Sequence, residues 1–221
     1  MVCGLKDVEK RFRRSIKLNL NHAMAHTWYG FYLTAMGRFD EARIEFRLAE
    51  EIAPLSLVTY GMTGWSLYMM RDYERAMEKF GKAIEMAPSF HTARWALGWC
   101  YTWKGQLAES LAQFEQARAF SGGGAEAIAG LGHACTKAGR IQEAQRLLDE
   151  LQELSRQRYI SPFYIALLYA GLEDKERTLE YLQKACEHRA EWMMHIKVDP
   201  VWDFLCSDNR FVELQKRIGL H

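Results

Sequence analysis

The sequence predicts an all-α fold, a right-handed superhelical solenoid of antiparallel helix pairs. First, residues of one kind recur at a step of 34 positions along most of the 221-residue chain. Second, each step carries two runs of apolar residues at helical spacing, separated by a helix-breaking residue. Third, a single helix pair cannot bury its apolar face by itself, so successive pairs must stack into a superhelix.

The repeating step is visible in four series of positions that keep one register without an insertion. The first two series are small residues at the positions where the helices would cross. The third series is large and apolar, and the fourth is alanine in every unit but one. The series are Gly30, Gly64, Gly98, Gly132 and Ala166; Ala42, Ala76, Ser110, Ala144 and Thr178; Phe12, Phe46, Phe80, Phe114, Leu148 and Leu182; and Ala49, Ala83, Ala117, Leu151 and Ala185. Pro54 and Pro88, one step apart, end two of the second helices.

Residues 5–18 come first and match only the second helix of a pair, with Phe12 in its usual place. The partner helix is missing, so we expect this edge to be shielded by something else or the chain to be a fragment. Val8 and Phe12 should then lack the cover that Ala42 and Phe46 have. An uncapped solenoid end is an apolar template, which favours self-association.

Five helix pairs follow, and the third pair shows why these residues form them. Leu97 and Tyr101 lie on one apolar stripe, and Gly105 then breaks the helix. Leu111 and Phe114 resume the pattern at a spacing of three. The predicted helices are 23–36 and 39–52, 57–70 and 73–86, 91–104 and 107–120, 125–138 and 141–154, and 161–171 and 175–188.

The last pair begins late, because Ser161 is typical of an N-cap and Pro162 of a first helical position. After this pair the chain departs from the repeat. The signals in the tail are the turn at Asp199-Pro200, the cap residue Ser207, and the amphipathic stripe of Phe211, Leu214 and Ile218. We expect the tail to cap the solenoid.

These residues resemble the tetratricopeptide repeat, for which a 34-residue period and this small and aromatic pattern are characteristic. The resemblance implies a half repeat at 1–22, five units at 23–56, 57–90, 91–124, 125–158 and 159–192 (together 23–192), and a capping segment at 193–221. The family's usual tryptophan near the start of each unit is replaced by His26, Tyr60, Arg94, Ile128 and Pro162. The stretch from Tyr159, with KVDP, SDNRF and RIGL after it, is similar to the closing segment of a bacterial subgroup. In that subgroup such repeats often follow a protein-kinase or winged-helix DNA-binding domain.

The composition is that of an ordinary globular protein, with 49% hydrophobic residues, 26% charged residues and a formal net charge of +1. Near-neutral charge disfavours nucleic acid as a partner. No run approaches the roughly 20 apolar residues of a membrane span, and the N-terminus lacks the apolar core of a signal peptide. Scattered cysteines predict reduced thiols in a cytoplasmic protein. These are Cys3, Cys100, Cys135, Cys186 and Cys206.

No motif predicts catalysis, so we expect no enzymatic activity, no cofactor, no metal and no small-molecule substrate. The glycine-rich stretch 121–124 lacks a following lysine and is interpreted as a linker. His133 and Cys135 are two positions apart on one helix, so they face different ways and cannot share a metal. The N-terminal helix is basic. It could contact nucleic acid or an acidic partner, but we favour the interpretation that its charged face is solvated. Its basic residues are Lys6, Lys10, Arg11, Arg13, Arg14 and Lys17.

Aromatic residues on the first helices form the candidate site. Trp95, Trp99 and Trp103 follow at a spacing of four, roughly 150° from the stripe that meets the second helix. First helices line the inner surface in this family, so the resemblance implies that the aromatic stripe faces a concave groove. The candidate peptide-binding or protein-binding residues are Trp28, Phe31, Met62, Trp65, Tyr68, Met69, Trp95, Trp99, Trp103 and His133.

Two interpretations of this stripe are open: packing between neighbouring units, or a partly exposed binding surface. We favour the binding surface, because each unit already has a separate core stripe. The fourth unit also replaces the three tryptophans with Ala129, His133 and Lys137, which should then reach solvent in part. Trp65 and Trp99 are the expected anchors, and Trp99→Ala should weaken binding by about 2 kcal/mol with the fold intact.

The sequence therefore predicts a non-enzymatic interaction module that binds an apolar segment of a peptide or protein. The lysine and asparagine clamp by which related grooves grip a terminal carboxylate is absent from the first three units. The alternative is the sensory or regulatory part of a larger bacterial signalling or transcription-regulator protein. The incomplete first repeat and the tail motivate that alternative.

Overall fold

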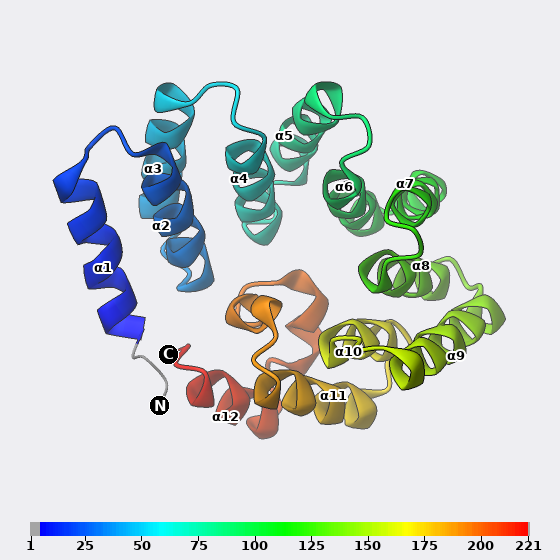
Figure 1. Cartoon of the computed structure of the whole chain (residues 1–221). Coiled ribbons are helices and arrows are strands. Elements are labelled where there is room, and N and C mark those ends of the chain that lie inside the picture. Colours follow the sequence, from blue (N-terminus) through cyan, green and yellow to red (C-terminus); the bar gives the residue numbers. More distant parts are fainter. Residues whose placement is uncertain (1–4, 221) are drawn as a thin grey trace.

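The computed structural model describes residues 5–220, and every regular element in that range is a helix. The first helix is α1 (Leu5–Leu18). Five pairs follow, α2 (Ala23–Ala35) with α3 (Phe39–Ile52), α4 (Leu57–Met69) with α5 (Tyr73–Met86), α6 (His91–Trp103) with α7 (Leu107–Phe120), α8 (Ala125–Lys137) with α9 (Ile141–Gln157), and α10 (Pro162–Gly171) with α11 (Lys175–Glu187). Figure 1 shows the pairs stacked in chain order along a curve. The predicted all-α solenoid is confirmed.

A glycine of each first helix lies directly against an aromatic ring of its partner helix in the first three pairs. A Cβ atom at Gly98 would lie 2.7 Å from Cε1 of Phe114, and one at Gly64 would lie 2.5 Å from Cε1 of Phe80. Both phenylalanine side chains are fully buried. The close approach of the helices therefore depends on the missing side chain, as the series of small residues predicted.

Gly98→Leu is expected to lower the free energy of unfolding by about 3 kcal/mol, because the new side chain overlaps the ring of Phe114. Urea denaturation measures the loss. Gly81→Ala is the matched control, since no atom lies within 4 Å of its added Cβ. Gly81 lies inside α5, so this control should gain about 0.5–1 kcal/mol. Equal stability of the two variants would contradict the crossing at Gly98.

The turn inside each pair needs one residue with left-handed backbone geometry. Gly37, Gly105 and Gly139 fill this position in three units, with φ of 74°, 73° and 74°. Arg71 (φ 65°) and Glu173 (φ 60°) fill it in the second and fifth units. A non-glycine residue in this conformation costs about 1–2 kcal/mol. Another interaction must therefore favour arginine at position 71.

After α11 the chain does not simply continue to the end of the solenoid. Residues 191–205, here called the inner segment, form two 3-10 helices, η1 (Glu191–His195) and η2 (Pro200–Leu205). Helix η1 contacts α2 and η2 contacts α10, so the segment lies within the curve of the helices (Figure 1). Helix α12 (Asn209–Arg217) lies against α11 at the end of the stack, whereas η1 reaches from α11 across to α2. The expectation that residues 193–221 as a whole form a cap is therefore wrong.

The N-terminal end is less well covered than the later units. Val8 and Phe12 are half-buried, whereas Ala42 and Phe46 are buried. The Phe12 ring lies 5.8 Å from that of Tyr29 and 5.9 Å from that of Tyr32, both on α2. Self-association through this end stays a prediction.

None of the helices between residues 5 and 220 has the length and apolar character required to cross a bilayer.

Candidate functional site

The candidate binding residues lie on α2, α4, α6 and α8, the helices of the concave side. Most of them are buried, with at most 7% of the side chain exposed. These are Phe31, Trp65, Tyr68, Met69, Trp95, Trp99 and His133. Trp28 is 44% exposed, and Met62 and Trp103 are half-buried. The expectation of a partly exposed aromatic floor is therefore wrong for the buried residues.

The inner segment covers the candidate residues in the middle of the groove. The ring centroid of Trp192 lies 5.0 Å from that of Trp65 and 5.4 Å from that of Trp95. Behind these rings, toward Tyr68 and Trp99, the remaining void measures only about 10 Å³. That volume is about the smallest that can hold one water molecule. The chain itself therefore fills the middle of its own groove.

Trp99 belongs to the core between units. Its ring lies 5.5 Å from Phe114 and 5.0 Å from His133, both in edge-to-face arrangements. Because Trp99 is only 2% exposed, the expectation that Trp99→Ala weakens binding with the fold intact loses its basis. The substitution would instead leave a cavity that costs about 3–5 kcal/mol.

The fourth unit also differs from its expected exposure. Ala129 and His133 are buried, because α10 packs on α8, and only Lys137 reaches solvent. His133 Nδ1 lies 3.0 Å from the carbonyl oxygen of Leu167. Burial lowers the pKa of His133 to about 4, so the ring is neutral at pH 7 and donates from Nδ1. The polar residue is therefore part of the packing and does not line an open groove.

A chain of hydrogen bonds holds the inner segment to α4. The Tyr68 hydroxyl donates to Oδ1 of Asp199 over 3.2 Å and accepts from Nε1 of Trp103 over 2.9 Å. The backbone N–H of Val201 also donates to Asp199 Oδ1, over 3.1 Å. Burial raises the pKa of Asp199 to about 6 despite these donors. This contact joins the second unit directly to the segment.

Arg71 is the second attachment point. Its guanidinium donates to the carbonyl oxygen of Val198 over 2.6 Å and forms a salt bridge of 2.9 Å with Asp203. Glycine at position 71 would remove the backbone strain but would lose these contacts. The inner segment therefore accounts for an arginine at a position where three of the other four units have glycine.

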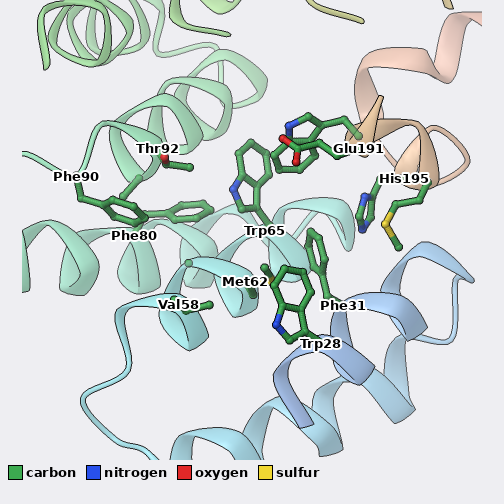
Figure 2. Close-up of a pocket in the computed structure, with 14 residues that line it drawn as sticks. Trp28, Phe31, Val58, Met62, Trp65, Phe80, Phe90, Thr92, Glu191 and His195 are labelled. Carbon is green, nitrogen blue, oxygen red and sulfur yellow. The ribbon is translucent and has the colours of Figure 1, made fainter. Parts of the chain in front are cut away.

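One part of the concave groove is left open, next to the inner segment (Figure 2). A cavity of about 290 Å³, here called the open pocket, lies between α2, α4, the start of α6 and η1. Its lining includes four of the candidate residues, Trp28, Phe31, Met62 and Trp65. The cavity is about twice the roughly 150 Å³ that accommodates a benzene molecule. It has room for an amino-acid side chain.

The lining of the open pocket is apolar and carries one charged group. Glu191 supplies that group, and no lysine or arginine lines the pocket. The buried ring of His195 lies 4.2 Å from Phe31. Burial lowers the pKa of His195 to about 3, which keeps the ring neutral at pH 7. The pocket therefore combines aromatic walls with a net negative charge.

Glu191, Trp192 and His195 are site residues that the sequence analysis missed, because they lie outside the repeat register. A signal was present in the stretch EWMMHIKVDPVWDFL, which is too apolar for a solvent-exposed tail. An apolar stretch of this length needs a matching apolar surface, and the tryptophan stripe was a predicted surface of that kind.

Comparison with known proteins agrees with this architecture. A family model described as tetratricopeptide repeat matches residues 62–125, and a second with the same description matches residues 104–161. Residues 62–161 contain tetratricopeptide repeats. Anaphase-promoting complex subunit 3 of Schizosaccharomyces pombe is 31% identical to this chain over 85 residues, which are 38% of the chain. The match spans only 12% of that protein.

Solved structures share the fold at low sequence identity. PilW, a type IV pilus biogenesis factor, has a TM-score of 0.65 at 18% identity, over 91% of this chain and 90% of PilW. YrrB, described as having an unusual peptide-binding site, has a TM-score of 0.52 at 20% identity, over 84% of this chain and 96% of YrrB. Tetratricopeptide-repeat proteins are generally protein-interaction modules. The resemblance to the repeats of bacterial kinases and regulators stays a prediction.

Proposed function

We propose that the protein is a non-enzymatic interaction module that binds a segment of a protein partner through the open pocket. The observation that carries this proposal is an apolar cavity of about 290 Å³ on the concave face, with a 44% exposed tryptophan in its lining. Exposed aromatic residues in a concave apolar site are typical anchors of protein interfaces. The peptide-binding site described for YrrB supports the same kind of ligand.

The proposed contact set is smaller than the sequence predicted. Trp28, Phe31, Met62 and Trp65 line the open pocket and would touch the partner. The other candidate residues, Tyr68, Met69, Trp95, Trp99, Trp103 and His133, are outside its lining, and we assign them to packing and to holding the inner segment. Most of the groove is pre-organised, so binding of a segment would cost little free energy for ordering the protein.

A peptide library displayed on phage and selected against the full chain tests this function. Selected peptides should bind Trp28→Ala with about 2 kcal/mol less free energy than the unmodified chain, because the indole contributes a large apolar contact. Phe120→Ala is the matched control, since Phe120 is 51% exposed but lies on α7, away from the pocket. Peptides that bind both variants with full affinity would contradict the assignment, as would a selection that enriches none.

We also propose a cytoplasmic location, which the free thiols support. Cys100 and Cys135 are buried, Cys186 is half-buried and Cys206 is exposed, and all four are unpaired. Cys3 lies outside the described residues.

A further inference from the structure

We propose that the open pocket takes a cationic side chain with an apolar stem, namely a lysine of the bound peptide in its methylated or unmodified form. This inference rests on the proposed function, since it assumes that a peptide enters the pocket. It names the chemistry that the pocket selects.

The first support is the arrangement of the aromatic rings. Trp28 and Phe31 come from α2, Trp65 from α4, Phe80 from α5 and Trp192 from η1, so rings line the pocket from four elements. Figure 2 shows the rings of α2, α4 and α5 around the pocket. The ring planes of Trp28 and Phe31 cross at 74°, and those of Phe31 and Trp192 cross at 84°. Rings at such angles form separate walls, unlike a flat stack. Ring faces carry partial negative charge and attract a cation within about 6 Å.

The second support is the charge of the lining. Glu191 is the one charged residue of the pocket, and a ligand carboxylate would face it with the same sign. No lining lysine or arginine competes for the ring faces or for this carboxylate. His195 stays neutral, because burial depresses its pKa to about 3. A ligand with one positive charge is therefore the complement of this lining.

The third support is the apolar part of the pocket lining other than Glu191 and the rings named above. Val58, Met62 and Phe90 line the pocket on α4 and just before α6. A lysine side chain offers four methylene groups for such a wall and one ammonium group for the rings and the carboxylate. Methyl groups on the nitrogen lower its hydration and spread its charge, which favours aromatic surroundings.

Three capped amino acids test the inference on the full chain. They are N-acetyl-lysine methylamide, its trimethylated form, and a neutral isostere in which a tert-butyl group replaces the trimethylammonium group. Dissociation constants come from indole NMR shifts. We expect at least one cationic probe to bind about tenfold more tightly than the isostere. Its affinity should fall as salt is raised, because salt screens the attraction to Glu191.

Two variants separate charge from shape. Glu191→Gln should weaken the cationic probe about threefold to tenfold and leave the isostere unchanged. Glu187→Gln is the matched control, since Glu187 is exposed on α11 outside the pocket, and it should change neither. Thermal melts establish that each variant is folded.

Equal binding of the isostere and the cations would overturn the inference, as would a Glu191→Gln variant with unchanged selectivity or the absence of binding by both cations. None of these results removes the proposed function, because an apolar peptide side chain can still occupy the pocket. The function fails separately, if the selected peptides do not depend on Trp28.

Discussion

Trp202→Ala is expected to lower the free energy of unfolding by about 3–5 kcal/mol, the range for emptying the site of a buried aromatic side chain. Trp202 has no exposed surface, and its ring lies 5.5 Å from that of Phe163 on α10. Its Nε1 has no hydrogen-bond partner within residues 5–220, so the loss comes from packing. Because Trp202 anchors η2 to the solenoid, its removal should also loosen the inner segment. Denaturation by urea measures the first effect, and proteolysis near residue 200 the second.

Phe204→Ala is the control for this prediction, since Phe204 belongs to the same 3-10 helix but is 40% exposed. It should cost less than about 1 kcal/mol. If the two variants were equally stable, the inner segment would not be docked on the concave face as the structure has it.

Acidification from pH 7 to pH 4 is expected to destabilise the protein by several kcal/mol, because two buried histidines resist protonation. Burial lowers the pKa of His195 from 6.5 to about 3 and that of His133 from 6.5 to about 4. Below pH 6.5 the unfolded chain takes up protons that the folded chain excludes, so the free energy of unfolding decreases as the pH is lowered. Between pH 6.5 and pH 4 this costs roughly 3 kcal/mol for each of the two histidines, at about 1.4 kcal/mol per pH unit.

Asp199 acts in the opposite direction. Burial raises the pKa of Asp199 from 3.8 to about 6, so the folded state binds its proton more tightly than the unfolded state does. Its contribution is absent at pH 7 and grows as the pH falls from about 6 to about 4, offsetting roughly 3 kcal/mol of the loss. The histidines outweigh it, and the net effect of acid is destabilising.

Urea denaturation at several pH values checks this balance. His195→Leu should remove the larger part of the pH dependence, because the unfolded chain then has no titrating group at that position. His188→Gln is the control, since His188 is exposed at the end of α11, and it should retain the dependence of the unmodified chain. A His195→Leu variant with an unchanged pH profile would show that His195 is not buried in the folded state.

The fold could be predicted from the sequence because the same packing constraint recurs in successive units and selects the same kind of residue at the same position each time. Gly64 and Gly98 each lie against a phenylalanine of the next helix, and both contacts were visible as positions in one register. The first helix of each unit was also expected on the concave side, and η1 contacts α2 there. Local periodicity determines these features, so a single sequence contains them.

The cover of the groove could not be predicted in the same way. Trp192 reaches Trp65 through a return of the chain that no local pattern encodes. The contrast between Trp95 and Ala129 was interpreted as a change in solvent exposure, although both side chains are buried. Their neighbours differ, because Trp95 meets the inner segment and α8 meets α10. Side-chain size at these positions follows the partner that covers them.

The return of the inner segment changes how such a stack of helices can fold. In a simple repeat array each unit contacts only its neighbours, so its ends fray and units unfold one at a time. Here the Tyr68–Asp199 hydrogen bond spans 131 positions, and the Arg71–Asp203 salt bridge spans 132. The second unit cannot open without releasing residues that also pack on the fifth. Closing loops of this length slows folding, and in return the array acquires the cooperativity of a globular domain.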